Sequence, residues 1–369
     1  MTRRELNIAI FEGKAEGVLW QPRLEEWIGY HRKHKTLPER FQDMDDLVIY
    51  DNLGCSIRYS ATAGLKQYYE PSDVECEEKK IDEEHRISTI RIPEGELRTV
   101  YHEIYKDGIL ENSRIAGFPV KTTSDLRVLT SLINRQHFQA DIEEFIRAVD
   151  KTANRAEPKL FLNGSGLTDL IKFRCGLLDT YYLLTDHQSA VEEYLEACNR
   201  RDDRQLEAAL KLPCRIFNLG DHATNEFTPP PILKRYLLPR WQKISARIKK
   251  EKRFVDSHWD GNSRLILPFL QETGLNGVEA LTPEPMGDIT LEEIKEAVKE
   301  NIVVSDLIPA IFFLPNYSVK EVVEYASRVI DMFAPRLILG VADELSPVGQ
   351  IEKIEAISEL LNKTCGLAT

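Results

Sequence analysis

Short apolar runs alternate with segments of helical pattern throughout the second half of the chain. Five such runs lie within residues 214–343, and they read "CRIFNLGD", "RFVDSH", "GVEAL", "IVVSDLI" and "RLILGVAD". They are largely apolar rather than regularly alternating, which is typical of strands buried on both faces in parallel sheets. Because a helical segment follows each run, the pattern predicts successive strand–helix units and a parallel α/β fold.

Two of the helical segments begin with a capping box. Thr290 precedes Glu293 by three residues, and Ser318 precedes Glu321 in the same way, so that each pair can satisfy free amides at a helix start. After Ser318, apolar residues recur on one face with the helical period. The sequence therefore predicts a helix that packs against the sheet through that face.

Three upstream runs, at 55–60, 113–120 and 158–166, add further candidate strands. Eight strands alternating with helices predict a (β/α)8 barrel, the TIM barrel, rather than a doubly wound sheet. We expect one barrel domain that spans residues 1–369.

Two segments differ from the barrel pattern and are expected to be insertions. Polar and apolar residues alternate about the turn Pro93-Glu94-Gly95, which predicts an inserted β-hairpin over residues 74–110. The stretch 166–212 has a helical pattern. It predicts a helical excursion over the carboxyl-terminal face of the barrel.

Composition narrows the classes of partner and location. The formal net charge is −12, so nothing resembles the basic face that nucleic acid or an anionic membrane would require. The run "IPAIFFLP" is far shorter than a membrane span, and the N-terminus has no signal-peptide core. The six cysteines form no C-x-x-C pair, which is typical of reduced thiols in the cytoplasm. A homodimer is the common default for a soluble enzyme.

Polar residues of catalytic and metal-binding types follow the predicted strands. In a barrel, the carboxyl ends of the strands form one mouth, where the chemistry takes place. We therefore expect convergence there of Asp221 and His222, His258 and Asp260, Glu279 and Glu284, Asp306, and Asp343 and Glu344.

Each of these positions also has a plainer interpretation. Asp260, followed by Gly261, is suited to a turn and to capping the next helix, and Asp221 has the same alternative role. A single histidine at a strand end is often only a hydrogen-bonding group. Glu284 lies between two prolines in a segment expected to be a solvated loop. The convergence of the whole set is what favours a functional site.

The segment from "FVDSHWDGN" to "GDITLEEIK", residues 254–295, resembles the uroporphyrinogen decarboxylase superfamily. Members show H-x-C-G-N before a helix and then a strand that enters a proline-rich loop. The similarity spans residues 205–362, from around "NLGDHATNEFTPPPILKRYLLPRWQKI" to around "RLILGVADELSP", with fainter echoes in "VLWQPR" and "LPERF". The resemblance implies the same barrel fold. The superfamily includes the decarboxylase and the zinc-dependent methyltransferases that work with corrinoid proteins.

The sequence departs from the decarboxylase at the residues that bind the tetrapyrrole. The decarboxylase uses two arginines four residues apart, whereas here Arg23 matches the first and Trp27 stands at the second. No segment resembles the F-S-D-I-L loop, and Val341-Ala342-Asp343-Glu344 replaces the glycine- and histidine-containing loop after the last strand. A porphyrinogen would leave charges and N–H donors without partners in such a site, so haem biosynthesis is not expected.

The methyltransferase branch binds zinc through the histidine and cysteine of H-x-C and a cysteine in the last loop. Here His258 matches the histidine, Asp260 replaces the first cysteine, and no cysteine lies near the second position. The resemblance implies a metal site made from His258, Asp260, Glu279, Asp343 and Glu344. Such ligands still suit zinc, but they favour activation of an oxygen substrate over a thiol.

Two enzymatic interpretations and one binding interpretation follow. The first is a methyltransferase that moves a methyl group from a small methoxy compound to a corrinoid carried by a partner protein, with assistance from zinc. Its catalytic residues would be His258, His222 and Asp221, and its substrate-binding residues would be Trp20, Arg23, Arg58 and Tyr59. The second is a decarboxylase or other lyase that acts on a small carboxylate. The third is a corrinoid- or tetrapyrrole-binding module without chemistry.

Overall fold

The structure is a computed structural model that describes residues 1–58, 60–61 and 63–365. It forms two units, each described on its own. The first comprises Met1–Thr62, Glu143–Phe161 and Pro213–Thr369, and the second comprises Ala63–Ile142 and Leu162–Leu212. Both predicted insertions, 74–110 and 166–212, fall in the second unit. The single-domain organisation and the position of the helical excursion over the barrel face stay predictions.

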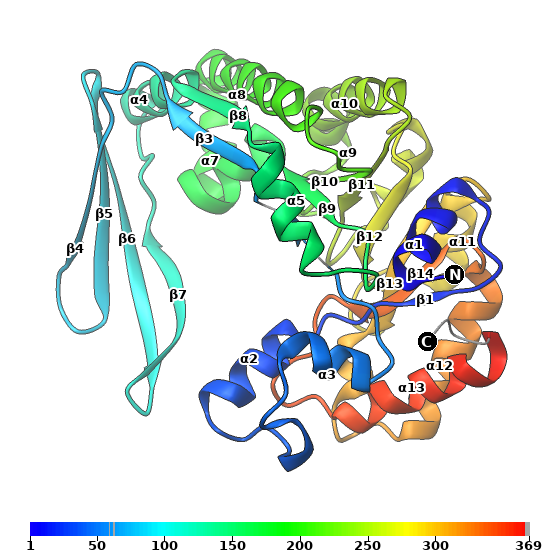
Figure 1. The fold of residues 1–369 in the computed structure, drawn as a ribbon. Helices are drawn as coiled ribbons and strands as arrows, with labels where there is room; N and C mark the ends of the chain where they lie inside the picture. Colours follow the sequence, from blue (N-terminus) through cyan, green and yellow to red (C-terminus); the bar gives the residue numbers. More distant parts are fainter. Residues whose placement is uncertain (59, 62, 366–369) are drawn as a thin grey trace. The chain divides into compact units, whose positions relative to one another are not determined.

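An eight-stranded sheet forms the centre of the first unit, with the order β1-β14-β13-β12-β11-β10-β9-β2 (Figure 1). Its strands are β1 (Leu19–Trp20), β2 (Ser60–Ala61), β9 (Lys159–Leu162), β10 (Ile216–Leu219), β11 (Phe254–His258), β12 (Gly277–Leu281), β13 (Val303–Pro309) and β14 (Leu337–Ala342). From β9 to β14 each strand neighbours the next along the chain, and the successive pairs from β10 to β14 run parallel. The parallel α/β fold predicted from the apolar runs is confirmed.

The two edge strands, β1 and β2, have no mutual pairing among the strand pairs of the described residues. A backbone hydrogen bond of 2.8 Å, from the amide of Ser56 to the carbonyl of Trp20, still joins β1 to the segment just before β2. The side chain of Gln21 reinforces this link by donating to the carbonyl of Ile57 at 2.7 Å. A hydrogen-bonded link thus runs between the two edges of the sheet.

The prediction of a barrel strand at 113–120 is wrong. That segment overlaps β7 (Ile109–Gly117), which belongs to an antiparallel sheet in the second unit. Its side chains are exposed or half-buried along the whole strand, whereas a strand of a parallel sheet is buried on both faces. The eighth strand of the parallel sheet is β1, whose two residues are too few to give a sequence pattern.

Helices follow the strands of the first unit as the alternation predicted, and a short 3-10 helix takes the place of one of them after β11. They are α1 (Arg3–Glu12), α2 (Glu25–Lys33), α3 (Asp46–Asn52), α5 (Ile142–Asp150), α9 (Pro230–Ile232), α10 (Leu238–Lys250), η4 (Leu267–Glu272), α11 (Leu291–Val298), α12 (Val319–Phe333) and α13 (Ile351–Cys365). Both predicted capping boxes are present, at Thr290 and at Ser318. On α12, residues Val322, Ala326, Val329 and Phe333 are buried, which confirms the predicted inward face.

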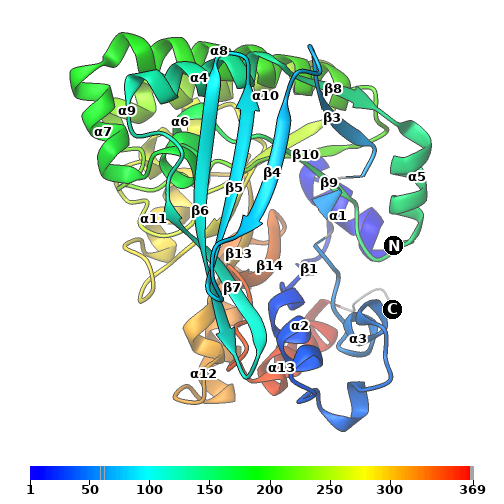
Figure 2. The ribbon, with the colours of Figure 1, turned by 90° about the vertical axis from the view of Figure 1, so that its left-hand side faces the viewer.

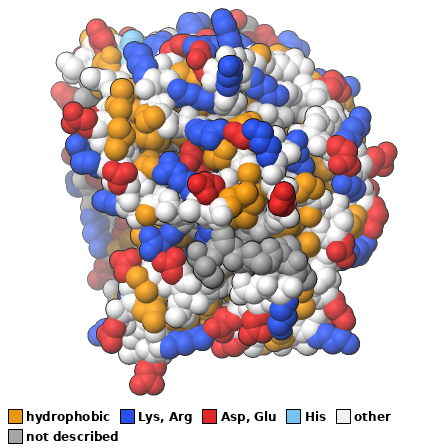
Figure 3. Space-filling model, turned by 45° about the vertical axis from the view of Figure 1, so that its right-hand side comes forward, with side chains coloured by type: hydrophobic (Ala, Val, Ile, Leu, Met, Phe, Trp, Pro, Cys, Tyr) orange, Lys and Arg blue, Asp and Glu red, His pale blue; other side chains and the backbone are white. Residues whose placement is uncertain are grey.

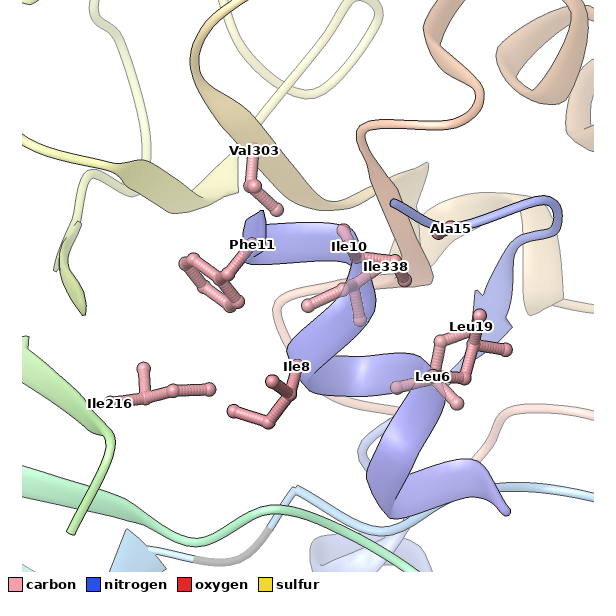
Figure 4. Close-up of a cluster of buried hydrophobic side chains, with 9 residues drawn as sticks. All are labelled: Leu6, Ile8, Ile10, Phe11, Ala15, Leu19, Ile216, Val303 and Ile338. Atoms are coloured by element: carbon pink, nitrogen blue, oxygen red, sulfur yellow. The ribbon is translucent and has the colours of Figure 1, made fainter. Parts of the chain in front are cut away.

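Helix α1 packs against the amino ends of the strands (Figure 4). Ile216 and Val303 begin β10 and β13, and Leu19 begins β1. These residues join one buried cluster, whose members are Leu6, Ile8, Ile10, Phe11, Ala15, Leu19, Ile216, Val303 and Ile338. The cluster fills the amino-terminal end of the sheet, so any site on these strands is left to their carboxyl ends.

The second unit contains two antiparallel sheets and several helices. Strands β4 (Glu75–Lys80), β5 (His85–Ile92), β6 (Gly95–Lys106) and β7 lie side by side in that order (Figure 2). Strands β3 (Leu65–Tyr69) and β8 (Gln136–Ala140) form the other sheet. The predicted hairpin corresponds to β5 and β6, to which β4 and β7 add. The helices are α4 (Thr123–Asn134), α6 (Gly166–Asp169), η2 (Leu170–Arg174), α7 (Leu177–Asp186) and α8 (Gln188–Ala209).

Charged side chains of both signs lie on the surface. On the face drawn in Figure 3, Lys and Arg side chains are interspersed with Asp and Glu side chains. No helix within the described part of the chain is both long and apolar enough to span a membrane.

Candidate functional site

Three side chains meet beyond the carboxyl ends of β10 and β11. His222 follows β10, His258 is the last residue of β11, and Asp260 lies two residues further on. One nitrogen from each histidine and a carboxylate oxygen of Asp260 lie within 4.8 Å of one another. Nδ1 of His222 is 3.2 Å from Oδ1 of Asp260, and Nε2 of His258 is 3.8 Å from the same oxygen. We call these three residues the histidine–aspartate group.

Asp260 does not take the capping role that the sequence left open. The backbone amides of Ser263 and Arg264, which a capping aspartate at this turn would bind, donate instead to Oδ1 of Asp288 at 2.8 and 3.1 Å. Gly261 has a φ of 76°, in the left-handed range, which turns the chain immediately after Asp260. The carboxylate of Asp260 is therefore directed to the two histidines.

The loops that carry this group are fastened to one another. The side-chain amide of Asn225, after β10, donates to Asp288, after β12, at 2.8 Å. The amide of Gly261, after β11, donates to the hydroxyl of Thr282 at 3.1 Å. Three loops from different strands thus share hydrogen bonds, which restricts the relative movement of His222 and Asp260.

His258 is held from behind by a carboxylate. Nδ1 of its ring lies 3.1 Å from Oε1 of Glu279, the middle residue of β12. Its other nitrogen, Nε2, is buried and has no hydrogen-bond partner among the described residues. Burial by itself would lower the pKa of His258, but its pairing with Asp260 and Glu279 outweighs this and raises the pKa to about 10. Because carboxylates lie on both sides of the ring, this position favours a positive charge, either a protonated ring or a bound cation.

The pKa of Asp260 moves the other way. Burial tends to raise it, but hydrogen bonding with His222 and His258 prevails and lowers the pKa below its usual range. The Asp260 carboxylate is therefore ionised at neutral pH, as a metal ligand must be.

Behind the histidine–aspartate group lies a network of buried charges. The ammonium of Lys159, the first residue of β9, donates to Asp256 and, at 2.8 Å, to Oε2 of Glu279. The guanidinium of Arg58 donates to Asp306 and lies 3.7 Å from Oε2 of Glu279. These five side chains are at most 3% exposed. Each buried charge has an oppositely charged partner, as burial requires.

The network sets the charge of its members. Burial would raise the pKa of Glu279, but Lys159 and Arg58 hold the pKa well below its usual range. Burial raises the pKa of Asp306 despite the attraction of Arg58. Glu279 is accordingly an anion against His258.

The backbone departs from regular strand geometry at this end of the sheet. Ala280, Asp306 and Leu307 have φ angles of 63°, 82° and 74°, and the register between β12 and β13 shifts at this point. Asp306 accepts a hydrogen bond from the amide of Ala280 at 2.9 Å. A Cβ at Gly340 of β14 would come within 2.6 Å of Oδ1 of Asp306. Positive φ angles in non-glycine residues, held by close packing, are typical of functional sites.

Two of the other predicted ligands, Asp343 and Glu344, pair with arginine side chains instead. Arg23 forms ion pairs with both Asp343 and Glu344, and Nη1 of Arg58 is 3.9 Å from Asp343. Glu279 contacts His258 through the ring nitrogen that faces away from Asp260. Of the five ligands predicted from the sequence, the structure brings His258 and Asp260 together. It adds His222, which the sequence predicted as a catalytic residue rather than a ligand.

Asp221 occupies a structural position. It is fully buried, accepts a 2.6 Å hydrogen bond from the indole of Trp241 and lies 3.6 Å from Arg240. These partners belong to α10, so Asp221 ties that helix to the sheet. The predicted catalytic role of Asp221 stays a prediction, and the contacts seen here are structural.

The remaining predicted residues vary in position. Trp20, at the end of β1, is only 1% exposed, and Glu284 is half exposed and pairs with Arg264 in a loop, as expected. Tyr59 lies outside the described residues. Lys159 and Asp256 were missed by sequence reasoning. The signal that could have revealed them is a charged residue inside an apolar strand, in "PKLFL" and in "FVDSH".

Comparisons with known proteins bear on the fold. No family model matches the chain, and no curated protein matches it in sequence. A solved methyltransferase from Methanosarcina mazei has a TM-score of 0.58 and 13% identity, over 98% of this chain and 99% of that one. A B12-independent methionine synthase from Shewanella sp. W3-18-1, in complex with selenomethionine, has a TM-score of 0.44 and 12% identity, over 94% and 96% of the two chains.

The likeness to the Methanosarcina protein extends over nearly the whole chain, and at this identity it is a likeness of fold. At the level of the fold, the chain is therefore similar to a solved methyltransferase.

Proposed function

We propose that this chain is a metal-assisted methyltransferase that takes a methyl group from a small methoxy compound and passes it to a corrinoid. The observation that carries the proposal is the buried Nε2 of His258, which lacks a hydrogen-bond partner among the described residues and faces Asp260 and His222. A methyltransferase-like fold makes methyl transfer the first reaction to test for such a site.

The residues present fit a zinc ion. Catalytic zinc sites commonly have three protein ligands and an open fourth position, and His222, His258 and Asp260 offer two imidazole nitrogens and one carboxylate oxygen. Glu279 binds the second ring nitrogen of His258, which is how metal-bound histidines are usually oriented. The group contains no sulfur, and such ligands favour an oxygen substrate over a thiol.

In this proposal, each side chain has a defined task. A zinc ion bound here would supply Lewis-acid polarisation of the ether oxygen of the substrate. His222, His258 and Asp260 hold that ion, and Glu279 fixes the ring of His258. Nε and Nη1 of Arg58 have no hydrogen-bond partner among the described residues, so they can donate to the substrate oxygen. A corrinoid on a partner protein would supply a reduced cobalt as the methyl acceptor, and the substrate oxygen would leave as an alkoxide or phenoxide.

Two finer features belong to the same proposal. We infer that the sheet closes as a (β/α)8 barrel, because the hydrogen bond from Ser56 to Trp20 connects its two edges. A decarboxylase or other lyase is less well supported, because Arg23, one of the two arginines that could anchor a substrate carboxylate alongside Arg58, already pairs with Asp343 and Glu344.

The test is methyl transfer to free cob(I)alamin. Purified protein loaded with zinc is incubated with cob(I)alamin and a panel of methoxylated compounds, and formation of methylcobalamin is followed by its absorption spectrum. We expect transfer by the wild type, loss of transfer in His258→Ala, and retention in the control His85→Ala, whose exposed ring pairs with Asp82. Release of carbon dioxide without methyl transfer, or failure of the wild type to retain zinc, would contradict the proposal.

A further inference from the structure

Lys159 has no task in the function proposed so far, although it is one of the most buried charged residues. It is the first residue of β9, and its side chain is 2% exposed. Its ammonium contacts two carboxylates, those of Asp256 on β11 and Glu279 on β12. Burying an ammonium is costly unless it is fully paired, so this placement needs a reason.

The two oxygens of Glu279 have different partners. Oε2 accepts a hydrogen bond from Lys159 at 2.8 Å, and Oε1 lies 3.1 Å from Nδ1 of His258. With Oε2 fixed, Oε1 has one direction left, which is toward the ring. Because a carboxylate only accepts hydrogen bonds, Nδ1 of His258 must be the donor. Nε2 is then the nitrogen that faces Asp260 and His222.

We propose that Lys159 is a positioning residue for metal binding. It acts through Glu279 on His258, so that Nε2 of His258 is presented to the histidine–aspartate group. This proposal rests on the proposed function, because it requires that the group bind a metal. Outer partners of metal ligands commonly contribute about 10–100-fold to metal affinity.

A role limited to stability makes a different prediction. If Lys159 only neutralised Asp256, its loss would lower the stability of the fold and leave the geometry of His258 unchanged. The visible spectrum of bound Co(II) depends on ligand geometry, so it separates a displaced ligand from a less stable protein.

The test compares two buried lysines. Lys159→Met removes the ammonium that holds Glu279. Lys353→Met removes an ammonium that is equally buried, in α13, where it donates to the carbonyls of Phe312 and Leu314. We expect Lys159→Met to weaken zinc and Co(II) binding by about 10–100-fold and to change the Co(II) spectrum. Lys353→Met is expected to retain the affinity and the spectrum of the wild type.

The outcomes separate this inference from the proposed function. If the wild type binds metal and Lys159→Met binds it equally well with the same spectrum, the role of Lys159 is overturned and the metal site stands. If the wild type binds neither zinc nor Co(II), both proposals are overturned.

A measurement on the wild type covers the case in which Lys159→Met does not fold. Long-range ¹H–¹⁵N correlation spectra of the zinc-loaded protein identify the histidine nitrogen that binds the metal. We expect coordination of His258 through Nε2 and a proton on Nδ1. Coordination through Nδ1 would overturn the inference.

Discussion

Asp260 shows how the role of one residue depends on its competitors. Its sequence context, with Gly261 and Asn262 next to it, suits a helix cap as well as a ligand. In the fold, Asp288 from a different loop binds the amides that Asp260 would have capped. Its carboxylate then lies against His222 and within 3.8 Å of His258. Asp288, a residue distant in the sequence, therefore decides what Asp260 does.

Asp260→Asn tests this assignment. The change keeps the shape of the side chain but removes the negative charge. Loss of an outer partner of a metal ligand typically lowers metal affinity by about 10–100-fold, and we expect loss of this direct ligand to lower zinc affinity by at least as much. Competition titration with a chromophoric chelator gives the affinity. Asp343→Asn is the comparison, because the sequence predicted Asp343 as a ligand whereas the structure pairs it with Arg23. A larger loss in Asp343→Asn than in Asp260→Asn would show that the sequence prediction was the better one.

At the scale of elements, the strands position the site through irregularities rather than through regular geometry. The register shifts between β12 and β13, and Ala280, Asp306 and Leu307 have positive φ angles. In this geometry the carboxylate of Asp306 accepts a hydrogen bond from the backbone amide of Ala280 in β12. Close approach of β14 at Gly340 leaves no room for a side chain beside Asp306. The apolar pattern predicted these strands, but it does not report such local departures.

The pair Gly340→Ala and Gly29→Ala measures this close packing. A Cβ at Gly340 would lie 2.6 Å from Asp306 and 2.9 Å from the carbonyl of Gln21, so we expect destabilisation of about 1–3 kcal/mol, as for other overpacked sites. Gly29 lies in α2 with open space around its Cα, so Gly29→Ala should stabilise the protein by about 0.5–1 kcal/mol. Urea unfolding gives both values. Equal effects of the two changes would contradict the packing argument.

At the scale of the first unit, the two ends of the parallel sheet differ in role: the amino end serves stability, and the carboxyl end carries the candidate site. Helix α1 fills the amino end with apolar side chains, and the carboxyl end carries the charges and histidines. This division is the usual one in barrels, where opposite ends of the strands serve stability and function. Mutations at the two ends should therefore have separable effects.

Ile10→Ala examines the stability end. Ile10 is fully buried in the α1 cluster, so the change should destabilise the protein by about 2–5 kcal/mol through lost burial and the cavity that remains. Zinc affinity of the protein that stays folded should equal that of the wild type. Chemical unfolding and zinc titration on the same preparation provide both numbers. A large change in affinity with little change in stability would show that the two ends are coupled.

The sequence predicted the strands and helices more accurately than it predicted which of them lie in contact. Apolar runs gave β10 to β14, and the capping boxes at Thr290 and Ser318 gave two helix starts, because both signals are local. The strand at 113–120 was misplaced, since a short apolar run does not reveal which sheet it joins. Two-residue β1 left no pattern at all.

By itself, the sequence determined that His222, His258, Asp260 and Glu279 would share one end of a parallel sheet. Parallel strands must end on the same side, so the placement of these residues follows from the strand pattern alone. Only the tertiary structure decided which of them face one another. That choice depends on cations from remote segments, because Arg23 pairs with Asp343 and Glu344 while Lys159 holds Glu279. A buried charge takes whichever partner the fold brings nearest, and the order of residues along the chain does not contain that distance.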